Sequence, residues 1–267
     1  MVIEAVLKIL NNLYSFGGKQ LPLSYLFRSL KRDRPKIEQY ADRSPSGPAV
    51  ADQKNFEGLF WEHDGSIVHK WHHYLPIYEK FLREYKGRPV KLLEIGVSRG
   101  GSLSLWRKYF GPDATIYGVD VDTSCEQYDG VDGQVRIGSQ DNVKFISDVV
   151  REMGGVDIVV DDGSHISRHI RTTFNTVFPL MNDGGIYIVE DLHAAYWPKF
   201  GGGYQSSKSF MSDISQMYDD MHHWYHSHGQ KISSAKDKLS AIHLYDSVAI
   251  FEKNQIAPPR HSRIGTE

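Results

Sequence analysis

The sequence has little cysteine, no excess charge of either sign and no long apolar run. A single cysteine, Cys125, among 267 residues excludes an intramolecular disulfide and a metal site built from several cysteines. The 31 Lys and Arg residues nearly balance the 33 Asp and Glu residues, whereas a dedicated nucleic-acid binder needs a basic excess to neutralise phosphates. No stretch approaches the ~20 apolar residues of a membrane-spanning helix. We therefore expect no nucleic-acid partner and no membrane span.

The length and composition are those of a globular protein. At about 150 residues per domain, 267 residues indicate one large domain or a domain with an extension. Glu4 and Lys8 interrupt the apolar pattern of residues 1–14, which argues against a secretory signal. We expect a cytoplasmic protein.

The first 60 residues differ in character from the rest. Apolar residues at helical spacing between Val2 and Leu13 predict a helix docked on the domain or on another subunit. A membrane-surface helix is the alternative. Residues 40–58 are polar and contain Pro45, Gly47 and Pro48, so they are predicted to be a linker. We expect a helical extension and linker over residues 1–60, a main domain over 61–256 and a tail over 257–267. The extension makes a homo-oligomer an expectation.

From Val90 onward, predicted strands and helices alternate. The strands are expected at residues 90–95, 115–120, 135–137, 156–160 and 185–189, and the helices at 102–110, 143–153, 167–181 and 206–226. A further helix is expected at 68–85. Such alternation predicts a parallel sheet with right-handed crossovers. Residues 240–245 and 248–252 flank a short turn and form an antiparallel hairpin. The predicted fold is α/β, a doubly wound, Rossmann-like, mostly parallel seven-stranded sheet that ends in this hairpin.

Polar and acidic residues follow every predicted parallel strand. They are Glu94 and Gly96, Asp120 and Asp122, residues 139–141, residues 161–165, and Glu190 with Asp191. In open parallel sheets, ligands bind beyond the carboxyl ends of the strands. These positions are therefore the candidate functional residues.

The glycine-containing loop after the first of these strands has several interpretations. A dinucleotide fingerprint would need glycines at 96, 98 and 101, but Ser98 takes the middle place. Gly96-x-Ser98-x-Gly100 fits a hydrolase nucleophile elbow, although residues 1–89 supply neither the earlier strands nor the oxyanion loop. An S-adenosylmethionine site needs the glycine turn and an acidic residue, here Asp120, for the ribose hydroxyls. A simple tight turn is the remaining alternative.

A second constellation follows the last two parallel strands. Asp162, Glu190 and Asp191 would meet at one rim, where three carboxylates repel unless they are protonated or bridged by a cation. Hard oxygen ligands suit Mg²⁺, which can lower the pKa of a bound hydroxyl. His165 is three residues after Asp162 and is suited to act as a general base. Helix caps and solvated charges are the alternative interpretation.

Together these motifs resemble a known family. The residues that carry the resemblance are Leu93–Val97 with Gly100–Leu103, Asp161–His165, Gly185–Tyr187, Glu190–Asp191 and Ala195–Trp197. Residues 70–253 resemble class I S-adenosylmethionine-dependent methyltransferases, and among them the metal-dependent sugar O-methyltransferases of the mycinamicin and demethylmacrocin group. Residues 1–60 match nothing in that group.

The resemblance implies roles for particular residues. It implies that Asp162, Glu190 and Asp191 hold Mg²⁺ and that His165 is the base. The cofactor-binding residues implied by the loop and the strand ends are Glu94, Gly96, Ser98, Gly100, Ser102, Asp120, Ser139, Gln140 and Asp161. The segment from Lys70 to Tyr74 resembles one that covers the cofactor.

The expected reaction moves a methyl group from S-adenosylmethionine to a hydroxyl of a small molecule or glycan. A sugar on a natural product or polysaccharide is the favoured acceptor, and a catechol or other phenol is an alternative. Leu192–Gln205, with its aromatics and glycines, is expected to be either an acceptor-binding lid or a packed structural loop. A hydrolase that uses Ser98 and a non-catalytic binding module are the rival functions.

Overall fold

The computed structural model describes residues 15–16, 19–20, 54–226 and 235–266. The chain divides into two compact units, residues 1–48 and 49–267. In the first unit, β1 (Ser15–Phe16) pairs antiparallel with β2 (Lys19–Gln20). The helix predicted between residues 2 and 13 lies outside the described residues.

The second unit is built on a seven-stranded sheet. Its strands are β3 (Lys91–Ile95), β4 (Thr115–Asp120), β5 (Gln134–Ile137), β6 (Ile158–Asp161), β7 (Gly185–Val189), β8 (Leu239–Tyr245) and β9 (Val248–Lys253). They are arranged in the order β5-β4-β3-β6-β7-β9-β8. The first five are mutually parallel, while β9 is antiparallel to both β7 and β8. This confirms the predicted mostly parallel sheet with a C-terminal hairpin.

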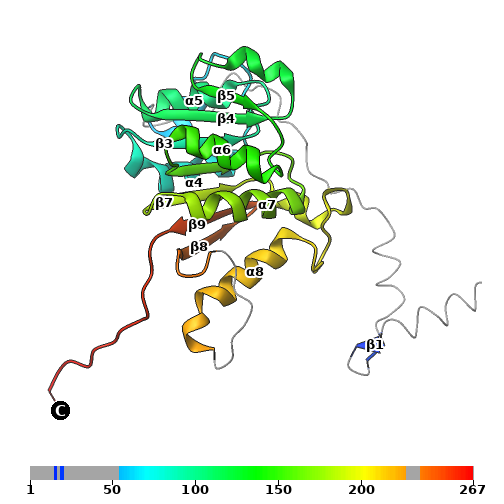
Figure 1. Ribbon diagram of the computed structural model, residues 1–267, viewed down its shortest axis with the longest axis vertical. Helices are drawn as coiled ribbons and strands as arrows, with labels where there is room; N and C mark the ends of the chain where they lie inside the picture. Colours follow the sequence, from blue (N-terminus) through cyan, green and yellow to red (C-terminus); the bar gives the residue numbers. More distant parts are fainter. Residues whose placement is uncertain (1–14, 17–18, 21–53, 227–234, 267) are drawn as a thin grey trace, which may run out of the picture. The chain divides into compact units, whose positions relative to one another are not determined.

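Helices cover both faces of the sheet (Figure 1). One face packs against α6 (Val143–Met153), α7 (Ser167–Val177) and α8 (Phe210–Met221), and the other against α3 (Phe56–Trp61), α4 (Leu75–Leu82) and α5 (Gly101–Phe110). Along β3, Leu93 contributes to the first core and Leu92 to the second. Burial on both faces explains why the parallel strands are continuous apolar runs rather than alternating patterns.

Local signals place the helix ends that surround the site. Asn142 caps α6 by accepting a hydrogen bond from the Phe145 N–H, and Gly154 ends it in the left-handed region. Gly100 precedes α5 with φ of 75°. Short 3-10 turns join the rest: η1 (His72–Tyr74), η2 (Arg83–Tyr85), η3 (Thr123–Tyr128), η4 (Phe178–Leu180), η5 (Leu192–Tyr196), η6 (Pro198–Phe200) and η7 (His223–Tyr225).

The structure differs from the sequence prediction mainly before β3. Residues 40–58 were predicted as a linker, but α3 begins at Phe56, which is fully buried. The Phe56 ring lies 4.8 Å from that of Tyr78 and 5.1 Å from that of Trp106. This aromatic packing draws α3 into the second core, so the compact unit starts before residue 61. The helix predicted at 68–85 is divided into η1, α4 and η2.

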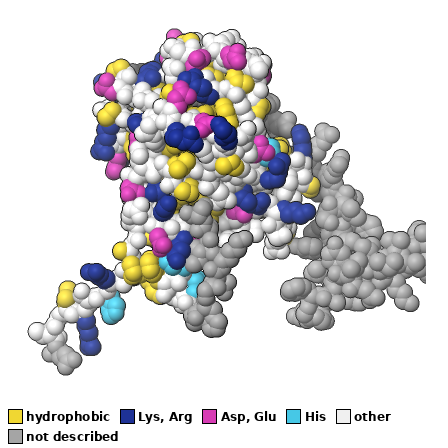
Figure 2. Space-filling model, viewed as in Figure 1, with side chains coloured by type: hydrophobic (Ala, Val, Ile, Leu, Met, Phe, Trp, Pro, Cys, Tyr) yellow, Lys and Arg dark blue, Asp and Glu magenta, His cyan; other side chains and the backbone are white. Residues whose placement is uncertain are grey.

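The surface carries both signs of charge. Figure 2 shows Lys and Arg side chains interspersed with Asp and Glu over the face that α6 and α7 cover. Among the described helices, none has the length and apolar character needed to cross a membrane.

Candidate active site

A cavity of about 480 Å³ opens at the carboxyl ends of the parallel strands. Its wall includes residues 67–70, 95–99, 119–121, 138–140 and 162–165, together with Ser102, His169 and Asp191. Ligand pockets of small molecules typically measure 300–1,000 Å³. The cavity therefore lies where the parallel topology predicts a ligand, and it has room for a molecule of nucleoside size.

One side of the cavity is the glycine loop, which Asp120 holds in place. Asp120 Oδ2 accepts hydrogen bonds from the backbone N–H groups of Val97 and Ser98, each 2.9 Å long. Its Oδ1 accepts another from the Asp122 N–H at 2.9 Å. Gly96 has φ of 97°, and a Cβ there would lie 2.3 Å from the Asp162 carbonyl oxygen. Only glycine fits this close approach of β3 to β6.

Two predicted cofactor residues, Glu94 and Asp161, lie behind the cavity wall rather than in it. Glu94 is fully buried and accepts hydrogen bonds from Ser102 Oγ at 2.7 Å and from Trp106 Nε1 at 3.0 Å. Burial raises the pKa of Glu94 to about 7. Burial also raises the pKa of Asp161 to about 6, although Tyr187 and Gln140 donate hydrogen bonds to it. Both carboxyls thus accept hydrogen bonds from residues that line the cavity, Glu94 from Ser102 and Asp161 from Gln140.

The turn after β5 is fixed by a similar network. Gln140 donates from Nε2 to Asp161 and to Thr173, and its Oε1 accepts from the Ser164 N–H at 2.7 Å. Ser139 donates to Asp141 at 2.6 Å. The predicted residues that line the cavity are Gly96, Ser98, Ser102, Asp120, Ser139, Gln140, Asp162, His165 and Asp191, whereas Glu94, Gly100, Asp161 and Glu190 do not.

On the opposite side, Asp162, His165 and Asp191 come together. One ligand atom from each lies within 4.8 Å of the others, and His165 Nε2 is 3.8 Å from Asp191 Oδ2. All three line the cavity. Two carboxylates and an imidazole within this distance form a donor set that fits a divalent cation with open coordination positions.

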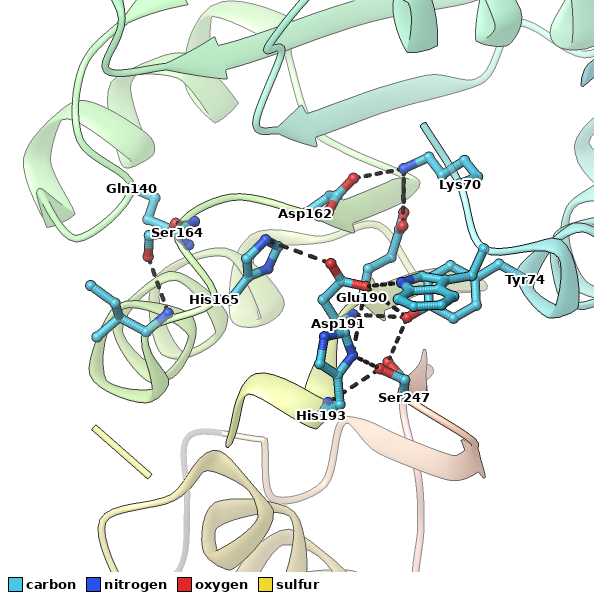
Figure 3. Close-up of polar contacts among 12 residues, drawn as sticks. Lys70, Tyr74, Gln140, Asp162, Ser164, His165, Glu190, Asp191, His193 and Ser247 are labelled. Carbon is cyan, nitrogen blue, oxygen red and sulfur yellow. Dashed lines mark hydrogen bonds and ion pairs between the residues drawn. The ribbon is translucent and has the colours of Figure 1, made fainter. Parts of the chain in front are cut away.

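Glu190 is separated from this cluster by its own partners. Figure 3 shows the Lys70 side chain reaching between Asp162 and Glu190. Lys70 Nζ lies 2.7 Å from Asp162 Oδ2, and 2.8 and 2.9 Å from the two oxygens of Glu190. The Tyr78 hydroxyl also donates to Glu190. Burial lowers the pKa of Lys70, but the two carboxylates outweigh it and raise that pKa, so the amine is charged.

Asp191 is held by residues from the same stretch of chain as Lys70 and Tyr78, residues 70–78. Its Oδ1 accepts hydrogen bonds from the Tyr74 hydroxyl at 2.8 Å and from Trp71 Nε1 at 3.1 Å. Next to it, His193 Nδ1 lies 2.6 Å from Ser247 Oγ in the turn between β8 and β9. Sequence reasoning named Lys70 and Tyr74 only as a covering segment and missed Trp71, Tyr78, His193 and Ser247 as partners. Their distance along the chain left no local pattern to find them.

Backbone strain gathers around the cavity. Among the described residues, the non-glycine residues with positive φ are Ser98, His165, Asp191, Gln205, Asp237 and Ser247. The first three line the cavity, and Ser247 contacts the backbone of Leu192 and the ring of His193. Each such conformation costs about 1–3 kcal/mol and persists where its surroundings enforce it, which is typical of functional sites.

Comparisons with known proteins agree with this geometry. A family model described as a methyltransferase domain matches residues 93–192. The 8-demethyl-8-alpha-L-rhamnosyl tetracenomycin-C 2'-O-methyltransferase of Streptomyces olivaceus is 33% identical over 244 residues, which are 83% of this chain and 63% of that protein. The demethylmacrocin O-methyltransferase of Streptomyces fradiae is 33% identical over 70% of this chain and 51% of its own length. The chain thus spans about half to three-fifths of these relatives.

A solved structure is similar as well. The MycE methyltransferase of the mycinamycin biosynthetic pathway, in complex with Mg and SAH, superposes with a TM-score of 0.69 at 30% identity, over 75% of this chain and 55% of that one. The matched residues 93–192 include most of the residues that line the cavity. Residues 93–192 of this chain are therefore a methyltransferase domain, and the chain resembles the sugar O-methyltransferases of macrolide and polyketide biosynthesis.

Proposed function

We propose that this protein is a Mg²⁺-dependent O-methyltransferase that moves a methyl group from S-adenosylmethionine to a sugar hydroxyl. The observation that carries the proposal is one cavity with two different sides. An ordered glycine loop with Asp120 forms one side, and Asp162, His165 and Asp191 form the other. The named activities of the relatives, and the Mg and SAH bound by MycE, support the same assignment.

The side chains on the two sides of the cavity have different roles in this reaction. On the cofactor side, the Asp120 carboxylate orders the loop with three accepted hydrogen bonds, and its Oδ1, which accepts only one of them, retains a lone pair for a ribose hydroxyl. On the other side, Asp162 and Asp191 are placed to hold the metal, with His165 as either a third ligand or the base. We assign His165 as the base, because its imidazole lines the cavity and a neutral imidazole nitrogen can accept a proton from a hydroxyl. Mg²⁺, when bound, would act as a Lewis acid toward the acceptor hydroxyl.

The proposed transfer is in line. The acceptor oxygen attacks the methyl carbon, the bond from methyl to sulfur breaks, and the electron pair stays on sulfur as a neutral thioether. His165 accepts the hydroxyl proton and releases it to solvent. Because the sulfonium charge disappears during the step, most of the rate gain comes from positioning and from a more nucleophilic oxygen.

Aromatic rings next to His165 favour a ring-shaped acceptor. The Phe200 ring is 6.3 Å from the His165 ring, and Trp197 lies 5.9 Å from Phe200 and 5.0 Å from His193. These residues belong to η5, η6 and their junction, within the segment expected to be a lid. Tyr196 beside them is exposed. A pyranose or a polyketide presents a flat apolar face to such rings.

The rival functions gain less from the structure. A hydrolase would need Ser98 next to a base, but in the described structure its hydrogen bonds run through the backbone, to Asp120 and from Cys125. A phenolic acceptor would satisfy the metal equally well, and it becomes the leading alternative if sugars fail as acceptors.

Calorimetry tests the proposal directly. S-adenosylmethionine is titrated into the protein with and without Mg²⁺, with NAD as the control ligand. We expect micromolar binding of S-adenosylmethionine and none of NAD, which would justify a screen of sugar-bearing acceptors. Absence of S-adenosylmethionine binding under both conditions would overturn the proposal. Full Mg²⁺-dependent activity in Asp191→Ala would overturn the metal assignment alone.

A further inference from the structure

A buried ammonium group, that of Lys70, lies between the carboxylates of Asp162 and Glu190. The Lys70 side chain is 2% exposed, as is that of Glu190. Its Nζ contacts one oxygen of Asp162 and both oxygens of Glu190 within 2.9 Å. Burying a charge is costly unless it is paired and hydrogen-bonded, and here all three donors of the ammonium have carboxylate acceptors.

The position of this ammonium is fixed by the segment that carries it. Tyr74 and Trp71 bind Asp191, and Tyr78 binds Glu190. His73 Nε2 lies 3.0 Å from the Asp246 carbonyl oxygen in the hairpin turn. Residues 70–78 are therefore attached to β6, β7 and the hairpin at several points. These contacts hold the backbone that carries Lys70 next to the carboxylates.

The net charge of the three carboxylates and Lys70 matches one divalent cation. Asp162, Glu190 and Asp191 contribute three negative charges when ionised and Lys70 contributes one positive charge, so the sum is −2. One Mg²⁺ would bring this sum to zero. Without the ammonium the sum would be −3, and Asp162 Oδ2 and the Glu190 carboxylate would lose their ammonium partner, while the Tyr78 hydroxyl would still donate to Glu190. Charges this close interact strongly because they are largely shielded from water.

We propose that Lys70 is a positioning residue that competes with the divalent cation. Its ammonium holds Asp162 and Glu190 as a pair, takes Glu190 away from the metal and keeps the affinity of the site for divalent ions low. This inference rests on the proposed function, because the cation it concerns is the one assigned there. A weakly held ion can respond to the acceptor, whose hydroxyl adds a ligand that the protein alone does not supply.

Metal affinity, measured without any substrate, tests the role of Lys70. Free Mn²⁺ is followed by electron paramagnetic resonance during titration of the full chain and of Lys70→Met. We expect Lys70→Met to bind Mn²⁺ at least about tenfold more tightly, since one neighbouring positive charge is removed. Lys70→Gln, which retains hydrogen-bond donors but not the charge, should behave in the same way, and Lys70→Arg should remain weak.

Matched controls separate this role from a structural one. Lys108→Met removes the same charge from an exposed ion pair with Asp64 and should leave Mn²⁺ affinity unchanged. A thermal melt should show Lys70→Met destabilised without metal and rescued by Mn²⁺. If Lys70→Met and Lys70→Gln bind Mn²⁺ no more tightly than wild type, or if no variant binds it, the inference is wrong. Calorimetric titration of S-adenosylmethionine into the wild-type protein without metal tests the proposed function separately.

Discussion

The two sides of the cavity are built in different ways. On the cofactor side, Asp120 reaches loop residues only 22 and 23 positions away, and Ser102 reaches Glu94 at 8 positions. On the acidic side, Lys70 and Tyr78 reach Glu190 over 120 and 112 positions, and Tyr74 reaches Asp191 over 117. The first side is organised by backbone amides within one βαβ unit. The second is organised by charged and phenolic side chains from a segment that precedes the sheet, so it forms only when the whole unit is folded.

The largest expected effect separates chemistry from cofactor binding. His165→Ala removes the proposed base, so kcat should fall by about 10²–10⁴-fold. Cofactor affinity should hold, because the Asp120 side of the cavity is untouched. Steady-state kinetics and calorimetry on the same variant check both points, with His222→Ala on the distant end of α8 as the control. An unchanged kcat would remove His165 from the mechanism.

The reverse separation is expected for Asp120. Asp120→Ala deprives three backbone N–H groups of their carboxylate. Hydrogen bonds to charged groups contribute about 1.5–3 kcal/mol, so the Kd for S-adenosylmethionine should rise by about 10–150-fold. Mn²⁺ affinity should stay that of wild type. Asp122→Ala, at the same strand end, is the matched control. Equal losses in both variants would show that the strand end, and not Asp120, organises the loop.

Glu94 links the cofactor side to pH. Its pKa rises from the ordinary 4.5 to about 7 on folding because it is buried. The folded state therefore binds this proton more tightly than the unfolded chain, and stability falls as the pH rises from 4.5 to about 7, by as much as ~3 kcal/mol. Glu94→Gln stays neutral and should lose this part of the pH dependence.

Urea denaturation of Glu94→Gln at the two ends of that pH range measures the effect. Cofactor affinity is the second readout, because Glu94 lies outside the cavity wall. We expect the affinity for S-adenosylmethionine to change by less than about threefold, because Glu94 does not reach the cavity. A large loss of affinity would return Glu94 to the direct cofactor contact that its motif predicts.

The smallest expected effect concerns Ser98, whose φ is 50°. A left-handed conformation costs an L-residue about 1–2 kcal/mol. Glycine avoids this cost, but fixing its more flexible backbone on folding costs about 0.5–1 kcal/mol more. Ser98→Gly should therefore stabilise the protein by about 0.5–1 kcal/mol while methyl transfer continues. Urea denaturation measures the first and an activity assay the second. Destabilisation would mean that the Ser98 side chain has a role in the loop that outweighs the strain.

The features that could be predicted from the sequence are those that depend on local signals. Strand positions, the hairpin and the grouping of Gly96, Asp120, Asp162, His165 and Asp191 could be read from the sequence. They depend on periodicity, on turn residues and on the rule that the ends of parallel strands meet. These signals lie within the residues concerned.

What the sequence could not provide depends on long-range packing. Glu190 follows β7 as predicted, yet Lys70 and Tyr78 occupy its oxygens, and no pattern near residue 190 announces a lysine 120 positions earlier. Glu94 carries the family motif, yet Ser102 and Trp106 hold it beneath the wall. The helix at Phe56 was missed because its anchor is a set of rings from α4 and α5 rather than its own apolar repeat.

The attachment of residues 70–78 also governs how this domain can be recombined. A chimera that moves residues 93–192, the span of the family match, into another protein transfers Asp162, Glu190 and Asp191 but leaves their ammonium and phenol partners behind. Unless the recipient offers a lysine at the same place, Glu190 is buried as an uncompensated charge, at a cost of several kcal/mol. The exchangeable module therefore begins before Lys70, more than twenty residues ahead of the first parallel strand.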